Sequence, residues 1–337
     1  RFQLTERRGC SMKDPVTEAD EEWTEEKPRV GISTCLLGEP VRYNGQHQWD
    51  RFLTGTVGKF VEWVPVCPEV ECGLPTPREA MRLVGDPEDP RLVTSRTERD
   101  MTEQVLEFSR RRVKELEDEN LCGFVFKARS PSSGMERVKV YDENGVPSSV
   151  GVGIFAREFM EHFPLVPVEE DGRLHDPGLR ENFFENIFCF RDYRRARSSG
   201  KVADLIDFHT HHKLQIMAHS PEKLREMGQL VANAREATED PFLLYEELLR
   251  EAMREQPSPG KNANVLQHML GYFKEELGAW EKQELLDVVS RYTKGLVPLI
   301  VPVTLIEHYV RKYDKDYLRE QSYLQPHPLE LKLRNHS

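Results

Sequence analysis

One short stretch, residues 66–78, constrains the fold more than any other because it combines cysteines, glutamates and three prolines. The apolar, β-rich run before it, residues 60–66, predicts a strand that leads directly into this stretch. The prolines then disfavour both a helix and a central strand. We therefore expect Cys67 and Cys72 on a rigid loop at the end of a strand, where open α/β sheets carry their sites.

The composition fits a globular protein with two ordinary domains, each with its own core, since the chain has 337 residues. Hydrophobic residues make up 38% and charged residues 31%, and no apolar run approaches the length of a bilayer span, so we expect no membrane partner. The net charge of −11 argues against sequence-independent binding along nucleic acid. Six cysteines without a secretory signal favour a reducing, cytoplasmic location.

The first half of the chain alternates strand and helix patterns. Four short apolar runs predict strands, at residues 29–35, 60–66, 121–126 and 163–168. Between the second and third runs, residues 102–119 place apolar side chains at helical spacing among charges, which indicates a helix covering a sheet face. This alternation predicts an α/β domain over residues 29–170, with a parallel-type sheet and flanking helices.

The rest of the chain differs in pattern. From residue 201 onward every segment has helical spacing, which predicts an all-α domain over residues 201–337. Residues 171–200 are predicted to be a helical linker, and residues 1–28 a disordered acidic tail. A basic cluster at residues 191–201 is the one place where nucleic acid could dock, although a solvated linker is the simpler interpretation.

A histidine group in the helical half, His209, His211 and His212, superficially resembles a metal-binding tract. On a helix, however, His209 and His212 share a face while His211 points away from them. We therefore interpret the group as a polar helix face or an interface.

Four cysteines lie at or beside predicted strand ends: Cys35, Cys67, Cys72 and Cys122. Thiolates from separate strand ends can converge on one soft metal ion or one iron–sulfur cluster. The alternative for each is a buried apolar residue, and for Cys122, inside its strand, the two interpretations are evenly balanced. No CxxC pair is present, so the spacing alone names no metal.

Other polar residues follow the same strand ends. Glu69 and Glu71 flank the thiols and could act as general acid or base, against the alternative of solvated loop carboxylates. Hydroxyls and arginines of the strand-end loops are further candidates for binding a substrate: Ser130, Ser132, Ser133, Arg42, Arg78 and Arg129. The hydroxyls would bind an oxyanion or heterocycle and the arginines an anionic ligand, against the alternatives of an ordinary turn and surface charges.

Together these motifs resemble the thiouracil desulfidase family over about residues 29–165. The resemblance is carried by the runs Ser33–Gly38, Val41–Gly45, Val66–Glu69, Gly73–Arg78 and Lys127–Gly134. The second half resembles the helical YbgA-type domain in the runs Phe208–Lys213, Asn262–His268 and Pro298–Pro302. This domain order is that of fused desulfidases linked to removal of sulfur from 4-thiouridine in tRNA.

The resemblance implies a hydrolase-type desulfidase with a 4Fe–4S cluster held by three cysteines. The open iron of this cluster would take the sulfur of a thiolated pyrimidine base or nucleoside. The resemblance also extends the expected partners to tRNA. It implies that Glu69 moves a proton of the attacking water and that Ser130 binds the ring edge. Many members carry cysteine at the position of Ser133, so Cys72 and Cys122 are the candidates for a third ligand. The alternative is a non-catalytic binding module in which zinc or nothing occupies the thiols.

Overall fold

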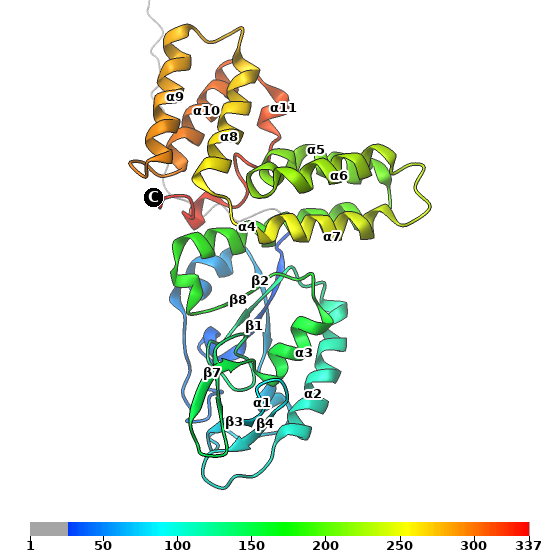
Figure 1. Cartoon of the computed structure of the whole chain (residues 1–337), viewed down its shortest axis with the longest axis vertical. Coiled ribbons are helices and arrows are strands. Elements are labelled where there is room, and N and C mark those ends of the chain that lie inside the picture. The colour runs from blue at the N-terminus through cyan, green and yellow to red at the C-terminus, as the bar shows by residue number, and fades with distance from the viewer. Residues whose placement is uncertain (1–25, 337) are drawn as a thin grey trace, which may run out of the picture.

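The computed structural model describes residues 26–336, so the tail predicted over residues 1–28 lies outside the described residues except at its end. Figure 1 shows an elongated molecule with an α/β unit at one end and a helical unit at the other. The predicted fold class, an α/β domain followed by an all-α domain, is confirmed. Within residues 26–336, no helix has the length and apolar character needed to span a membrane.

The α/β unit is built on a four-stranded parallel sheet in the order β2-β1-β5-β8. Its strands are β1 (Arg29–Ser33), β2 (Glu62–Val66), β5 (Gly123–Phe126) and β8 (Val168–Glu170). Gly31 is needed at the centre of the sheet, because a Cβ atom there would lie 2.1 Å from the ring of Phe124. Because all four strands run in one direction, the loops that follow them leave from the same edge of the sheet.

Helices cover both faces of this sheet. On one face, α2 (Thr102–Glu115) and α3 (Ile154–His162) pack against the aromatic side chains of β5, and the ring centroids of Phe124 and Phe159 are 4.7 Å apart. On the other face, Ile32 and Val125 share a core with aromatic residues of α4 (Pro177–Ser198). Burial on both faces explains why the centre of β1 and all of β5 lack charged residues.

A second four-stranded sheet was not predicted from the sequence. Its order is β4-β3-β6-β7, with β3 (Met81–Gly85), β4 (Pro90–Thr94), β6 (Val138–Tyr141) and β7 (Pro147–Gly151). Four of the five residues of β7 are exposed, so this strand lacks the apolar pattern that marks a buried strand. The stretch expected to form only a loop also contains a short helix, α1 (Pro68–Glu71). Proline is tolerated at the first position of a helix because no hydrogen bond is lost there.

The segment predicted as a linker is instead a packed helix. The first half of α4 contributes Phe184 and Ile187 to the core under the parallel sheet. Its second half contributes Phe190 and Tyr193 to a core shared with α5 (Val202–His219) and α7 (Pro241–Arg254). One helix therefore belongs to the hydrophobic cores of both units.

The helical unit agrees with the helical spacing found in the sequence after residue 201. Its further helices are α6 (Pro221–Asn233), α8 (Pro259–Leu270), α9 (Ala279–Thr293), α10 (Ile300–Lys312) and the short α11 (Asp316–Arg319). Proline stands in the first turn of α7 and α8, where Asp240 and Ser258 cap the free backbone amides.

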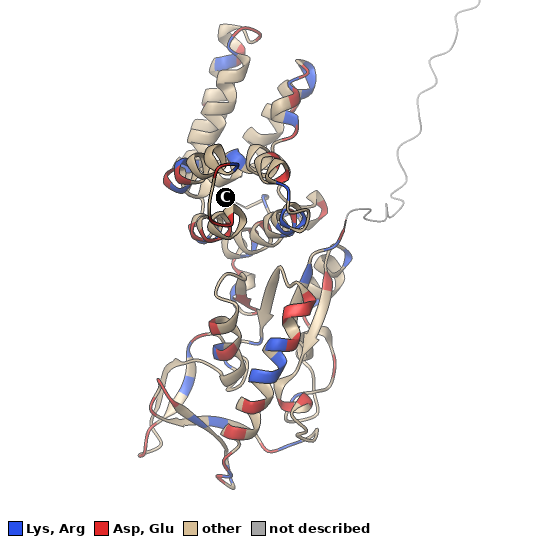
Figure 2. Ribbon diagram, turned by 90° about the vertical axis from the view of Figure 1, so that its right-hand side faces the viewer, with Lys and Arg blue, Asp and Glu red and all other residues tan. Residues whose placement is uncertain are grey.

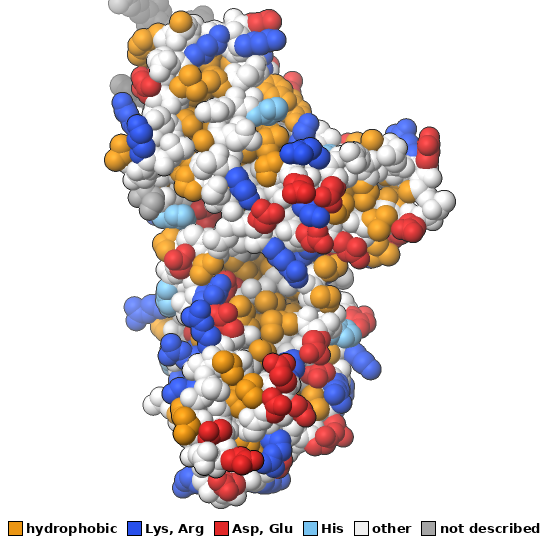
Figure 3. All heavy atoms as spheres, in the orientation of Figure 1, with side chains coloured by type: hydrophobic (Ala, Val, Ile, Leu, Met, Phe, Trp, Pro, Cys, Tyr) orange, Lys and Arg blue, Asp and Glu red, His pale blue; other side chains and the backbone are white. Residues whose placement is uncertain are grey.

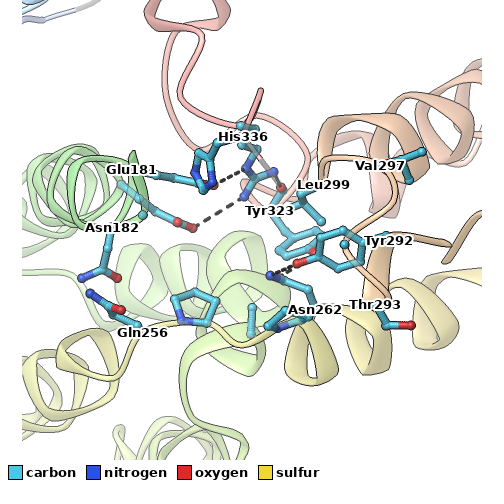
Figure 4. Close-up of a pocket in the computed structure, with 17 residues that line it drawn as sticks. Glu181, Asn182, Gln256, Asn262, Tyr292, Thr293, Val297, Leu299, Tyr323 and His336 are labelled. Carbon is cyan, nitrogen blue, oxygen red and sulfur yellow. Dashed lines mark hydrogen bonds and ion pairs between the residues drawn. The ribbon is translucent and has the colours of Figure 1, made fainter. Parts of the chain in front are cut away.

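After α11 the chain returns to the α/β unit, where Leu331 and Leu333 enter the core under the sheet. The buried guanidinium of Arg334 lies 3.2 Å from a carboxylate oxygen of Glu181 and 3.7 Å from one of Glu185, both on α4. Figure 4 shows His336 facing Glu181, with Nε2 and a carboxylate oxygen 2.7 Å apart. The C-terminal segment thus fastens the helical unit to α4.

Replacing Arg334 with alanine should lower the free energy of unfolding by about 3–5 kcal/mol, because the buried carboxylate of Glu185 and the partly buried one of Glu181 each lose their arginine partner. Urea unfolding would measure this change. Arg311→Ala, at an exposed position of α10, is the matched control and should change stability by less than about 0.5 kcal/mol. Equal losses in both variants would contradict the structural role of Arg334.

Candidate functional site

A cavity of about 290 Å³ lies at the edge of the parallel sheet where β1, β2 and β5 end. The loops after these three strands form its wall. Most of the residues predicted to be functional line it: Cys35, Cys67, Glu69, Arg42, Arg78, Arg129, Ser130 and Ser133. The structure therefore brings together side chains that are far apart in the sequence. Cys35 and Ser133, for example, are 98 positions apart.

Two of the four predicted thiol ligands face this cavity. Cys35 lies in the turn after β1 and Cys67 directly follows β2, and each is 8% exposed. Burial raises the pKa of Cys35 to about 11, and burial together with the carboxylate of Glu69 raises the pKa of Cys67 to about 12. Both thiols are protonated at neutral pH without a metal, so metal binding would have to release their protons.

The other two thiols do not reach the cavity. Cys122 lies before β5, where its N–H bonds the carbonyl of Arg29 at the start of β1, and the four residues of β5 separate it from the cavity by roughly 13 Å. Cys72 ends α1, donates its Sγ–H to the Glu69 carbonyl over 3.2 Å and packs beside the core of the second sheet. The prediction that Cys72 or Cys122 completes a ligand set therefore disagrees with the geometry.

Ser133 is the third potential ligand at the cavity that the two thiols face. Its side chain is nearly buried, lines the cavity, and contacts the hydroxyl of Ser132 at 3.3 Å. Ser133 thus adds a hydroxyl to the two thiols at the cavity. Within residues 26–336, no group of three or more cysteine, histidine or carboxylate side chains is arranged to hold a metal ion.

A chain of hydroxyls connects Ser130 to Glu69. Ser132 Oγ donates to Glu69 Oε1 over 2.5 Å, and Ser130 Oγ lies 3.0 Å from Ser132 Oγ. Because Ser132 donates its hydroxyl hydrogen to Glu69, Ser130 is the donor in the hydrogen bond between the two serines. Ser132 is fully buried and does not line the cavity, so it connects these residues rather than binding substrate as predicted.

Two of the three predicted arginines, Arg42 and Arg78, take different positions at the cavity wall. The side chain of Arg78 is 8% exposed, lies 3.8 Å from Glu69 Oε2 and donates to the Val41 carbonyl over 3.0 Å. Arg42 is half-buried and donates to Gln48 over 3.0 Å. Arg78 therefore fixes the orientation of Glu69, while Arg42 is held at the wall by a neutral partner.

The sequence analysis gave no role to a buried ion pair beside the cavity. Lys127 follows β5 and its Nζ lies 2.9 Å from Asp171, which follows β8 and also accepts the N–H of Ala128 over 2.7 Å. Lys127 lines the cavity, and its own N–H donates to Ser33. Asp171 directly follows the observed strand β8, but the strand predicted from the sequence ended at residue 168, so the criterion applied to the thiols did not select it.

The histidines of α5 pack within the helical unit. His212 is buried, stacks on Phe208 with ring centroids 4.2 Å apart, and contacts Gln215 at 2.8 Å. His209 lies 3.0 Å from the hydroxyl of Tyr245, and burial lowers the pKa of its imidazole to about 4. These contacts give His209 and His212 structural partners.

The predicted basic cluster of residues 191–201 is paired with acidic neighbours. Arg191 and Arg195 both form ion pairs with Asp192, and Arg197 forms one with Glu246. Figure 2 shows basic and acidic residues interleaved on the helices rather than separated onto different faces. The cluster is therefore a weaker candidate for nucleic-acid docking than its sequence suggests.

Comparison with known proteins gives two family matches. A model described as 2-thiouracil desulfurase matches residues 30–171, and one described as a protein of unknown function, DUF1722, matches residues 213–328. The uncharacterized protein YbgA of Escherichia coli is 29% identical over 152 residues, which cover 44% of this chain and 90% of that protein. The uncharacterized protein YbbK of Bacillus subtilis is 30% identical over 109 residues, which cover 31% of this chain and 71% of that protein.

Among solved structures, the 4Fe-4S-dependent thiouracil desulfidase TudS is 27% identical. The match covers 44% of this chain and 95% of that one, with a TM-score of 0.37.

The serine loop depends on a close contact with the start of α3, which one substitution can test. The carbonyl of Ser132 accepts the N–H of Phe155 over 2.8 Å, and a Cβ atom on Gly153 would lie 2.5 Å from that same carbonyl group. Gly153→Ala should therefore displace the loop and lower the free energy of unfolding by about 1–3 kcal/mol, measured by urea unfolding. Gly55→Ala, where an added Cβ meets no atom within 4 Å, is the control. A stable Gly153→Ala variant would contradict this contact.

Proposed function

Residues 30–171 of this chain belong to the 2-thiouracil desulfurase family and residues 213–328 to the DUF1722 family, and on this basis we propose that the protein is a desulfidase that replaces sulfur by oxygen in a thiolated pyrimidine. The observation that carries the proposal is the placement of a carboxylate beside a buried thiol. Glu69 Oε2 lies 3.5 Å from Cys67 Sγ inside a cavity that Cys35 also lines. A soft-metal site with an adjacent acid–base group is what removal of sulfur requires.

The proposed cofactor is a 4Fe–4S cluster, and the donor set fits one if Ser133 contributes an oxygen. Cys35 and Cys67 would supply two thiolates and Ser133 an alkoxide, since Cys72 and Cys122 do not face the cavity. Such a cluster, when bound, supplies a Lewis-acidic iron that accepts sulfur. A hard alkoxide is a poorer partner for iron–sulfur chemistry than a thiolate, so we propose that this site holds its cluster weakly.

The chain's own residues would then bind the pyrimidine and move protons. Glu69 is held by Arg78 on one side and Ser132 on the other, which positions it to take a proton from an attacking water. Ser130 faces the cavity and would bind the ring edge of the pyrimidine. Because Ser130 donates to Ser132 and Ser132 donates to Glu69, a proton taken up at the carboxylate returns to the substrate side through the two hydroxyls only after both O–H bonds have rotated.

The proposed substrates are a free thiolated base, a nucleoside and 4-thiouridine within tRNA. The cavity wall carries the cationic side chains Arg42, Arg78, Lys127 and Arg129, against the carboxylate of Glu69. The exposed ring of Tyr43 also lines the cavity and offers a surface on which a base can stack. These features support a pyrimidine substrate and leave the mouth accessible to a larger molecule that carries it.

Glu69→Gln should keep the iron content of protein reconstituted without oxygen but lower the rate of sulfide release from 2-thiouracil or 4-thiouridine roughly 10²- to 10⁴-fold, because the proton acceptor is lost. Iron analysis and a sulfide assay on the same sample measure both effects. Glu62→Gln, on an exposed carboxylate of β2, is the control and should retain activity. Undiminished turnover in Glu69→Gln would refute the proton-transfer role.

Ser133→Cys should increase the iron and inorganic sulfide bound per chain after reconstitution and slow the loss of visible absorption in air, because a third thiolate replaces an oxygen donor. Cys67→Ser should have the opposite effect, and Cys122→Ser should change neither quantity because Cys122 faces away from the cavity. If Cys122→Ser releases the cluster while Ser133→Cys has no effect, the proposed ligand set is wrong.

A further inference from the structure

A second cavity, of about 380 Å³, lies where the two units meet. It is bounded by the end of α3 and the segment before β8 on one side, and by α4 and α7 on the other. Figure 3 shows a hollow with hydrophobic side chains at this junction and basic side chains on its border. The cavity adjoins the start of β8, whereas the cavity with the thiols lies beyond the ends of the parallel strands. The two cavities are therefore at opposite ends of the sheet.

A buried cation without a partner lines this second cavity. Arg250, on α7, is 5% exposed, and its Nε is fully buried without a hydrogen bond. Within residues 26–336, its guanidinium forms no ion pair with a carboxylate. A buried charge that is unpaired is costly and is normally compensated by a counter-charge.

The nearby carboxylates are already engaged elsewhere. Glu246, one turn before Arg250 on α7, forms an ion pair with Arg197. Glu169, at the cavity wall, lies 2.6 Å from Arg173 Nε. The chain therefore leaves Arg250 without a carboxylate of its own.

Two further arginines, Arg194 and Arg254, stand near Arg250 together with the carboxylate of Glu246. Burial and the neighbouring Arg254 lower the pKa of Arg250 to about 9, which still leaves it charged at neutral pH. Its guanidinium stacks over the ring of Phe190 at 5.1 Å, and this contact holds the group in place. The Arg254 side chain donates to the Pro164 carbonyl over 2.7 Å, which fixes a second cation at the border of the cavity.

We propose that this cavity binds a small organic anion, whose carboxylate or phosphate pairs with Arg250 and whose apolar body lies against Phe163, Leu179 and Met253. Arginine suits this role because its planar guanidinium can hold a carboxylate or a phosphate through two parallel hydrogen bonds. Phe163 belongs to the α/β unit and Met253 to the helical unit, so the bound anion contacts both. The site is separate from the desulfidase cavity and does not depend on that proposed function.

Thermal unfolding of the full chain with benzoate, phenyl phosphate and the neutral analogue benzamide tests this proposal. At ten times its Kd, an anionic probe should raise the Tm by roughly 2–4 °C, while benzamide should not. A shift with benzoate alone would identify a carboxylate ligand, and a shift with phenyl phosphate alone a phosphate ester. Absence of a shift with both anions, or an equal shift with benzamide, would overturn the proposal.

Arg250→Met should weaken binding of the anionic probe roughly 10- to 100-fold in calorimetric titration. Its Tm without ligand should equal or exceed that of the original chain, because a buried unpaired charge is removed. Arg225→Met, on the exposed surface of α6, is the control and should bind as before. Leu179→Trp, which fills the cavity while keeping Arg250, should also abolish binding and decides the matter if Arg250→Met does not fold. Undiminished binding in Arg250→Met or Leu179→Trp, or a Tm of Arg250→Met well below that of the control, would refute the site.

Discussion

The parallel alignment of β1, β2 and β5 is the constraint on which the thiol cavity depends. Adjacent parallel strands lie about 4.8 Å apart, so loops leaving the same edge of the sheet are automatically neighbours. The alignment is maintained by the contact between Gly31 and the ring of Phe124, which leaves no room for a side chain on β1. Phe124 in turn stacks on Phe126 with ring centroids 4.4 Å apart and packs against α3. A change at Gly31 would therefore be felt at the ends of all three strands.

The same packing connects the sheet to the helical unit. Because α4 contributes aromatic side chains to both cores, the units are joined by a hydrophobic interior rather than by a flexible segment. The C-terminal segment adds Leu331 and Leu333 to the core under the sheet. Units joined in this way are expected to move as one body more than units joined by a short polar linker. A ligand bound between α4, α7 and α3 would therefore add contacts to an interface that is already packed without it.

Three of the four parallel strands could be predicted because burial leaves a short apolar run in the sequence. The fourth prediction, residues 163–168, was misplaced, because β8 begins only at Val168 and contains two glutamates. The second sheet could not be predicted, since strands such as β7 are mostly exposed and have no such run. For Cys122 the sequence left a ligand and a core residue evenly balanced, and the structure places it in the core before β5. Its place near the start of the predicted strand could have excluded it, because the site lies where the parallel strands end. Ser132 was predicted to touch substrate because a serine-rich loop does not reveal which hydroxyl points inward.

The role of Arg250 was beyond the sequence for a further reason. An arginine in an amphipathic helix is ordinarily exposed, and only the packing of α7 against α4 buries this one. Glu246 stands one turn away on the same helix, so the sequence would have suggested an ion pair between them. In the structure Glu246 instead forms an ion pair with Arg197, so the guanidinium of Arg250 has no counter-charge of its own.

The acidic character of the whole chain does not decide what its cavities bind. The net charge of −11 is spread over 337 residues, and at physiological ionic strength charges are screened over about 8 Å. Inside a cavity the nearest side chains dominate, and the thiol cavity is lined by Arg42, Arg78 and Lys127. The proposed substrate, an electron-rich thiolated pyrimidine, would therefore meet cationic side chains in an acidic protein. A long RNA would meet the acidic exterior as well. Arginines at the end of α4 are already paired with Asp192 and Glu246, so they offer little free positive charge to the RNA. Binding of RNA would therefore have to come from local contacts at the cavity mouth.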